Sequence, residues 1–435
     1  IDMALIKYIT DIEIEFGAIA KLPDACRAHG IKRPLIVTDA GIKAAGLLQH
    51  AVSALGDLPH AVYAETPSNP TEAAVRAATA IYKDAKCDGL IALGGGSSMD
   101  CGKGVAIAVA HDGPLKTYAT IEGGSPKITP AVAPLIAVPT TSGTGSEVAR
   151  GAIIIVDDGR KLGFHSWSLV PKVAICDPEL TLNLPPALTA ATGMDAIAHC
   201  METFMAPPYN PPADGIALDG LARGWKHIET ATADGSDRAA RLAMMSASVQ
   251  GAMAFQKGLG CVHSLSHSLG GVNPRLHHGT LNALFLPAVI RFNAGAASIQ
   301  AEHRMSRMAY AMGRDGGSSA LSTISSKNGT PTTATGLITA GDYDTTYSVS
   351  YTTNGDCPTT TIVSVTSIIA DDSSFEMTPT CDGATATITG LVGGTFAFDT
   401  APTDAAVIDS STGLITAGNY DTTYSVSYTT NGDCP

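Results

Sequence analysis

The composition of the chain changes abruptly near residue 315, so the whole chain is not expected to share one core. Residues 1–315 contain all 12 histidines and 26 of the 27 basic residues, and this part is nearly neutral. Residues 316–435 contain one basic residue, Lys327, and 12 acidic residues, which accounts for most of the net charge of −13. A chain of 435 residues is expected to form two or three domains. We predict domains at 1–180, 181–315 and 316–435.

The first 180 residues alternate short apolar stretches with helical ones. Apolar strands are expected at 34–39, 89–93 and 134–138, and the stretch 71–83 has an apolar helical stripe. This order predicts the α/β class, with a mostly parallel sheet that has helices on its faces. Such sheets bind ligands at the carboxyl ends of their strands.

The apolar period becomes helical from residue 184 and stays helical as far as residue 312. The part from 181 to 315 is therefore predicted to be an all-α domain. The expected helical runs are 186–204, 214–227, 237–255 and 297–312.

The last 120 residues contain an internal repeat with a period of 77 residues. The segment 335–358 recurs at 412–435 with one change, Asp342 against Asn419, and the first repeat is incomplete. Apolar and hydroxyl side chains alternate at 347–351, which predicts half-buried strands of an all-β sandwich. Cys381 and Cys434 lie near the two ends of the complete unit, so we expect a disulfide between them if this part is exported.

Charge and apolar patterning exclude several classes of partner. The acidic tail lacks the basic patch that nucleic acids and anionic membranes require, and no run of about 18 apolar residues could span a bilayer. The first part has no signal peptide pattern as given and no CxxC pair, so we expect reduced thiols and a cytoplasmic location for residues 1–315. The repeat tail argues for export, and the sequence leaves this conflict open.

An aspartate and four histidines stand at spacings that suit a metal site: Asp195-x3-His199, His263-x3-His267, and then His277. One carboxylate and neutral imidazoles form a ligand set for a divalent transition metal. A chain with 12 histidines also produces such pairs by accident. Two pairs in an apolar helical region favour the metal site, since Asp and His enter a buried face only when they are paired or ligated.

Three features near strand ends could bind a nucleotide. The turn GGGSSMD at 94–100 would let the backbone approach a pyrophosphate at a helix N-terminus, or it is only a tight turn. The loop PTTSGTGSE at 139–147 offers hydroxyl groups, or it is a turn with a helix cap. Asp39 could accept hydrogen bonds from a ribose diol and so favour NAD over NADP, or it could cap the next helix.

Residues 3–314 resemble the iron-containing (group III) alcohol dehydrogenases. The motifs GGGSSMD, PTTSGTGSEV, KLGFHSWSLVPKVAICDPELTLNLPP, GMDAIAHCMETF and HSLSHSLGGVNPRLHHGTLNALFLPAVIRFN occur in family order. The resemblance implies an α/β dinucleotide-binding domain, a helical domain, and catalysis in the cleft between them. It also implies a homo-oligomer in which Fe(II) and NAD support hydride transfer between a small alcohol and its aldehyde.

The resemblance assigns roles to individual residues. It implies Asp195, His199, His263 and His277 as metal ligands, with His267 as a proton relay and with His278 as the competing candidate for the fourth ligand. The implied cofactor contacts are Asp39, Asn69, Gly95, Gly96, Ser97, Thr140, Thr141, Thr144 and Lys161.

Two other functions remain open at this point. Zinc accepts the same ligands, so a zinc-dependent polyol dehydrogenase of the same superfamily is one alternative. The tail resembles immunoglobulin-like repeats of bacterial surface proteins, so a secreted adhesive protein with a vestigial enzyme part is another. Family members continue their helical domain beyond the equivalent of Met312, whereas this chain turns to β repeats. We therefore expect an exposed apolar surface and weakened or lost activity.

Overall fold

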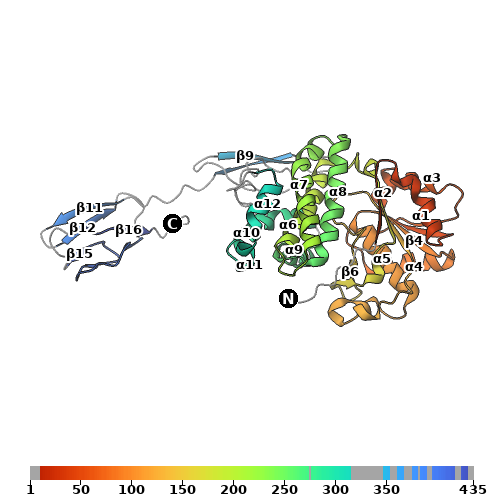
Figure 1. Ribbon diagram of the computed structural model, residues 1–435, viewed down its shortest axis with the longest axis horizontal. Coiled ribbons are helices and arrows are strands. Elements are labelled where there is room, and N and C mark those ends of the chain that lie inside the picture. The colour runs from red at the N-terminus through yellow and green to blue at the C-terminus, as the bar shows by residue number, and fades with distance from the viewer. Residues whose placement is uncertain are drawn as a thin grey trace. The chain divides into compact units, whose positions relative to one another are not determined.

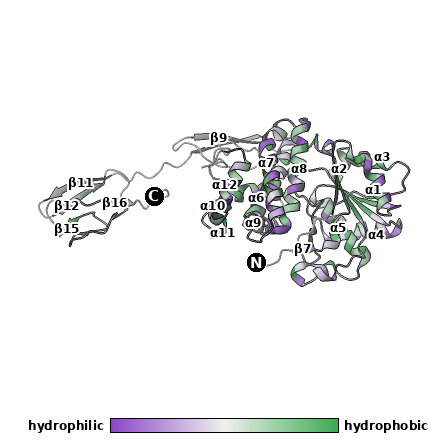
Figure 2. Ribbon diagram, viewed as in Figure 1, coloured by the Kyte–Doolittle hydropathy of each residue, from purple (hydrophilic) through white to green (hydrophobic). Residues whose placement is uncertain are grey.

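A six-stranded parallel sheet organises the N-terminal part of the chain, which confirms the predicted α/β class. The strand order is β1-β8-β5-β4-β2-β3, and every neighbouring pair is parallel. The central strands are buried on both faces, which explains why they read as apolar runs without alternation (Figure 2). The strands are β1 Asp11–Ile14, β2 Pro34–Val37, β3 Ala61–Tyr63, β4 Gly89–Gly94, β5 Leu135–Pro139 and β8 Val173–Cys176.

Helices cover both faces of this sheet (Figure 1). On one face, α4 and α5 pack against Leu35 and Leu90, and on the other, α1 and α3 pack against Ile36 and Ile91. Thr71 caps α4 by accepting a hydrogen bond from the Ala74 amide. The helices are α1 Leu22–Ala28, α2 Ala40–Ala44, α3 Leu47–Leu55, α4 Glu72–Asp84 and α5 Gly96–Ala110.

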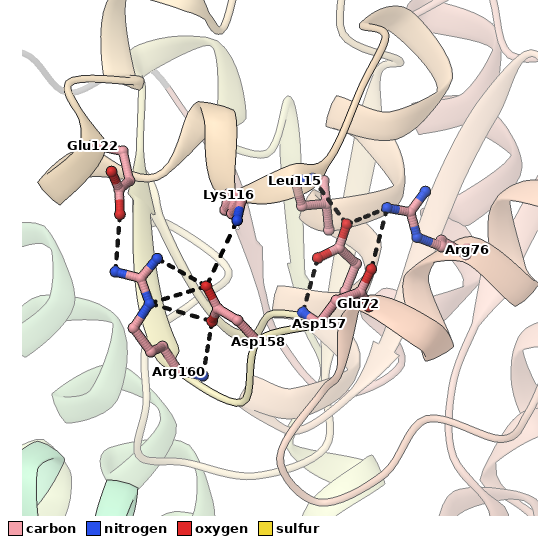
Figure 3. Close-up of polar contacts among 8 residues, drawn as sticks. All are labelled: Glu72, Arg76, Leu115, Lys116, Glu122, Asp157, Asp158 and Arg160. Carbon is pink, nitrogen blue, oxygen red and sulfur yellow. Dashed lines mark hydrogen bonds and ion pairs between the residues drawn. The ribbon is translucent and has the colours of Figure 1, made fainter.

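A β-hairpin that the sequence analysis did not predict lies between β5 and β8. Its strands, β6 Gly151–Ile155 and β7 Lys161–His165, pair antiparallel. The buried Glu72 carboxylate accepts hydrogen bonds from the amides of Leu115 and Asp157, and Arg160 at the start of β7 pairs with Asp158 and Glu122 (Figure 3). These contacts fix the hairpin to the α/β part. Short 3-10 segments occur at Ala18–Lys21, Leu115–Tyr118, Thr120–Glu122, Ser125–Lys127, Trp167–Leu169, Pro178–Thr181 and Phe255–Lys257.

The following part is helical, as expected, and is built around the buried helix α6. This helix contacts α7, α8 and α10, and they share one apolar cluster. The expected single helix at 297–312 is wrong, because the chain breaks at His303, whose φ of 51° is left-handed. The helices are α6 Pro186–Met205, α7 Pro211–Ala233, α8 Arg238–Ala254, α9 Cys261–Val272, α10 His278–Asn293, α11 Ala297–Ala301 and α12 Arg304–Ala311. Among the described residues, no helix combines the length and apolar character that crossing a bilayer requires.

The tail contains small antiparallel sheets in a separate unit. This computed structural model describes residues 10–273, 276–314, 346–352, 360–366, 375–380, 383–388, 394–416 and 423–429. The chain divides into unit 1, residues 1–337, and unit 2, residues 338–435, and the predicted domain boundaries at 180 and 315 stay predictions. Cys357, Cys381 and Cys434 lie outside the described residues, as does the predicted disulfide. The tail strands are β9 Thr346–Thr352, β10 Thr360–Thr366, β11 Phe375–Thr380, β12 Gly383–Ile388, β13 Thr395–Phe398, β14 Val407–Ile408, β15 Ile415–Thr416 and β16 Val426–Thr429.

Candidate functional site

Three imidazoles surround one carboxylate oxygen inside the helical part of the chain. Asp195 Oδ1 lies 3.4 Å from His263 Nε2, 3.7 Å from His278 Nε2 and 3.8 Å from His199 Nε2. Asp195 and His199 lie one turn apart on α6, His263 belongs to α9, and His278 begins α10. Two donor atoms that bind one tetrahedral metal at about 2.1 Å are themselves about 3.4 Å apart, so the spacing fits a bound ion.

The structure corrects the prediction that His277 is the fourth member of this cluster. Donor atoms of Asp195, His263 and His278 lie within 4.8 Å of one another, whereas His277 is exposed and precedes α10 as its N-cap. Neighbouring residues at a helix start point in directions about 100° apart, so only one of the two histidines can face Asp195. The candidate that the sequence analysis ranked second is therefore the one at the cluster.

The protonation states in the cluster also suit a metal. Burial alone would raise the pKa of Asp195, but His199, His278 and His263 hold it well below its usual range, so the carboxylate is charged. Burial lowers the pKa of His199 to about 3, so this imidazole keeps a free lone pair. Its Nδ1 is buried without a hydrogen-bond partner among the described residues. The donor set therefore fits a divalent cation.

Two polar residues that the sequence analysis missed hold the cluster in place. Glu202, one turn after His199 on α6, accepts hydrogen bonds from His263 Nδ1 and from the amides of Val262 at 2.8 Å and His263 at 3.2 Å. Since Nδ1 donates to Glu202, Nε2 is the ring nitrogen of His263 that faces Asp195. Asn282 on α10 donates to Asp195 Oδ1 at 2.7 Å. Continued helical spacing, His199-x2-Glu202 and His278-x3-Asn282, was the available sequence signal.

His267 lies beside the cluster without joining it. It is half-buried one turn after His263 on α9, and its ring stacks on that of His278 with 4.5 Å between centroids. The pKa of His267 is lowered to about 3, mainly by burial and further by the charges of His278 and His263. The imidazole is therefore neutral at physiological pH.

A large cavity of about 1000 Å³ lies at the carboxyl ends of β2, β4 and β5 and reaches Asp195 and His278. Its wall at the start of α5 has no room for side chains, since a Cβ on Gly96 would lie 2.9 Å from Thr144. The amides at the N-terminus of this 15-residue helix are available to an anionic ligand. All nine predicted cofactor contacts line this cavity: Asp39, Asn69, Gly95, Gly96, Ser97, Thr140, Thr141, Thr144 and Lys161.

Two of these residues also make structural contacts. Asp39 caps α2 by accepting a hydrogen bond from the Ile42 amide at 2.9 Å, so the capping alternative is confirmed. Its other carboxylate oxygen accepts from the Ser98 hydroxyl at 3.0 Å. Lys161 on β7 donates to Asn69 Oδ1 at 2.9 Å, and burial lowers its pKa. Hydrogen bonds thus fix both side chains at the cavity wall.

A smaller cavity of about 370 Å³ shares Asp195, His278 and Lys161 with the larger one. Its remaining wall includes Arg150, His165 and the neutral His267, none of which lines the larger cavity. The cluster therefore lies where a smaller and a larger cavity meet. This arrangement can bring a reacting group and an extended ligand to the same metal.

Comparisons with known proteins agree on one family. The model of the family "Iron-containing alcohol dehydrogenase" matches residues 10–178, and that of "Fe-containing alcohol dehydrogenase family, C-terminal" matches residues 189–330. The 4-hydroxybutyrate dehydrogenase of Cupriavidus necator is 67% identical over 314 residues, which are 71% of this chain and 82% of that protein. The 1,3-propanediol dehydrogenase of Klebsiella pneumoniae is 38% identical, over 64% of this chain and 72% of that protein.

Solved structures show the same similarity. A 1,3-propanediol oxidoreductase has a TM-score of 0.69 and 34% identity, over 74% of this chain and 84% of that one. A sulfoacetaldehyde reductase from Bifidobacterium kashiwanohense in complex with NAD+ has a TM-score of 0.68 and 29% identity, over 74% of this chain and 85% of that one.

Proposed function

Because the chain belongs to the iron-containing alcohol dehydrogenase family and is therefore an NAD-dependent oxidoreductase of alcohols, we propose that its substrate is a short ω-hydroxy acid such as 4-hydroxybutyrate. The observation that carries the proposal is the carboxylate and imidazole cluster at the junction of two cavities. The 67% identity with a 4-hydroxybutyrate dehydrogenase supports the substrate class. In the oxidation, the alcohol loses a hydride from carbon to NAD+ and a proton from oxygen, which yields the aldehyde, NADH and H+.

The residues that would hold iron are Asp195, His199, His263 and His278. When bound, the metal supplies a Lewis acid that polarises the alcohol oxygen and eases the loss of its proton. His267 is neutral beside this position and is the candidate to accept that proton. As a relay, it would pass the proton on to solvent.

The cofactor-binding residues would act mainly through the backbone. The amides at the start of α5, at Gly96 and Ser97, would donate hydrogen bonds to the pyrophosphate of NAD. Asp39 and Thr140 also line the cavity, and the charge of Asp39 disfavours a 2'-phosphate, so NAD is preferred to NADP. The cavity that would hold the dinucleotide also reaches Asp195 and His278.

A matched pair of variants tests this site. Protein purified without oxygen is loaded with Fe(II) or Zn(II), and NADH formation from 4-hydroxybutyrate and 1,4-butanediol is followed by absorbance. We expect iron-dependent turnover, a loss of at least about 100-fold in His278→Ala, and a much smaller effect in His277→Ala. No NAD reduction with either substrate would overturn the proposed function, and zinc-only turnover would favour the zinc-dependent enzyme.

The chain's activity is proposed to be weaker than that of its relatives. Leu265, Leu269 and Val272 on α9, Phe292 on α10 and Tyr310 on α12 are exposed apolar side chains, which supports a missing packing partner. The thermal melt and turnover of this chain, measured beside those of the Cupriavidus necator enzyme, test the idea. Equal melting temperature and turnover would contradict it.

The tail and the cellular setting carry separate proposals. We propose that residues 316–435 form immunoglobulin-like repeats, a proposal that their antiparallel strand pairs support, and that residues 1–315 work in the cytoplasm as a homo-oligomer. The six cysteines of unit 1 are free thiols, which supports a reducing compartment. Mass spectrometry of native protein tests the compartment. A Cys381 to Cys434 disulfide would favour export, and free thiols would favour the cytoplasm. Light scattering that gives a monomer mass would contradict the oligomer.

A further inference from the structure

We propose that His165 and Arg150 form a subsite that binds the distal carboxylate of the substrate and selects ω-hydroxy acids over neutral alcohols. The proposal rests on the proposed function and deepens it. Both residues line the small cavity that ends at Asp195 and His278. Neither lines the larger cavity, so the nucleotide phosphates do not account for them.

Two glycines make room for the His165 imidazole in the hairpin. Gly151 lies directly opposite His165 in the β6 and β7 register, and Gly163 precedes it by two residues on the same face. A Cβ on Gly151 would lie 2.9 Å from His165 Cδ2, and one on Gly163 would lie 2.8 Å from Cε1. A side chain at either position would therefore displace the ring from the cavity wall.

A hydrogen-bond chain reaches Nδ1 of His165. Ser125 Oγ donates to Thr120 Oγ1 at 3.1 Å, and Thr120 Oγ1 lies 2.8 Å from His165 Nδ1. A Thr120 hydroxyl that accepts from Ser125 still has its own proton to donate to Nδ1, and in that tautomer Nε2 is an N–H donor. Burial lowers the pKa of His165, and the charges of Arg150 and Lys103 lower it further, so the ring is neutral. The subsite thus offers a neutral donor beside a cation.

Arg150 supplies that cation. Its guanidinium carbon lies 5.0 Å from the centroid of the Trp167 ring, and no carboxylate of the described residues lies within ion-pair distance of it. The anions on the cavity wall are already engaged: Asp100 accepts from Ser146 Oγ at 2.8 Å and from the Ile153 amide at 2.9 Å, and Asp195 belongs to the cluster. A guanidinium beside an imidazole N–H matches a carboxylate, which accepts from both.

The cavity size is consistent with one small substrate. About 370 Å³ is near the lower end of small-molecule sites. A short chain with its hydroxyl at the cluster would extend its other end along the wall that contains His165 and Arg150. The anchored turn of the hairpin (Figure 3) keeps this wall in place.

The test compares two substrates of equal length, 4-hydroxybutyrate and the neutral 1,4-butanediol, in the full iron-loaded chain. For His165→Val and Arg150→Met, we expect kcat/KM for the acid relative to the diol to fall about 10- to 100-fold, mainly through KM. Thr120→Val, which removes only the hydroxyl that contacts His165 Nδ1, should give a smaller fall in this ratio. His60→Val changes a half-buried histidine that does not line the cavity and should leave the ratio unchanged.

A second readout covers poor folding of the variants. Butyrate should inhibit diol oxidation competitively in the parent chain, and its inhibition constant should rise about tenfold or more in Arg150→Met. An equal fall for acid and diol, with unchanged butyrate inhibition, would overturn the subsite and leave the proposed function standing. A parent chain that oxidises neither substrate would overturn both.

Discussion

Replacing Glu202 with glutamine is expected to weaken metal binding without changing any residue that lines the substrate cavity. Glu202 is buried, does not line either cavity, and reaches the site only through α9. It accepts three hydrogen bonds, one from His263 Nδ1 and two from the amides of Val262 and His263. Glutamine keeps one acceptor oxygen but removes the charge that orients His263 and raises the basicity of this ligand.

The structure gives a magnitude for this change and a contrast with alanine. Loss of the partner of a metal-binding imidazole typically costs 10- to 100-fold in metal affinity, which is about 1.4 to 2.8 kcal/mol. Alanine at position 202 would also leave the amides of Val262 and His263 without acceptors. At about 1 to 3 kcal/mol for each buried donor, this variant should lose roughly 2 to 6 kcal/mol of unfolding free energy even without metal. Glutamine should lose much less.

The assay is a titration of metal-free protein with Fe(II) under anaerobic conditions, combined with urea unfolding of the same samples. Glu179→Gln is the control, since Glu179 forms an exposed ion pair with Arg238 and should change stability by less than about 1 kcal/mol. Metal affinity should be unchanged in this control. If Glu202→Gln binds Fe(II) as tightly as the parent chain, Glu202 does not support the site.

Three further predictions concern the cofactor and the buried charges. Asp39→Asn keeps an oxygen for the α2 cap but removes the charge, so kcat/KM with NADP relative to NAD should rise about tenfold, and an unchanged ratio would refute this. Burial raises the pKa of Glu147 from 4.5 to about 7, so over this range the folded state binds a proton that the unfolded state lacks, and stability falls as pH rises. In urea unfolding, the unfolding free energy of Glu147→Gln relative to that of the parent chain should therefore rise by up to about 3 kcal/mol from pH 5 to pH 8. A difference that stays constant over this pH range would contradict the prediction. Asp214→Ala leaves Lys257 and Arg304 as buried cations without this partner and should lower the unfolding free energy, measured in urea, by about 3 to 5 kcal/mol. A loss of less than about 1 kcal/mol would contradict this prediction.

The sheet could be predicted because its central strands are apolar on both faces. The hairpin of β6 and β7 could not, although it contributes Lys161 and His165 to the cavities. Gly151–Ile155 reads as an apolar run, but its strand partner is β7 and it lies outside the six-stranded sheet, and Gly151 and Gly163 weaken the strand pattern. The reason for the two glycines is the His165 ring packed against them, a contact that local pattern does not show.

The break at His303 was also hidden from the sequence. Residues 297–312 keep helical spacing, yet His303 adopts a left-handed conformation without being glycine. Arg304 directly after it is buried and donates to the Phe204 carbonyl and to Asp214 on α7. Contacts of α12 with α6 and α7, and not local propensity, therefore fix the break.

The choice between His277 and His278 shows which sequence signal decides a ligand. Counting from His267 crosses a loop, and a loop can gain or lose a residue without changing the helices on either side. The packing of α10 on α6 is less permissive, because a Cβ on Gly279 would lie 2.1 Å from the Ala191 carbonyl oxygen. This close approach turns the residue before Gly279 toward Asp195, and Asn282 one turn later reaches the same carboxylate. The spacing of His278, Gly279 and Asn282 within the helix therefore identifies the ligand better than the distance from the preceding histidine.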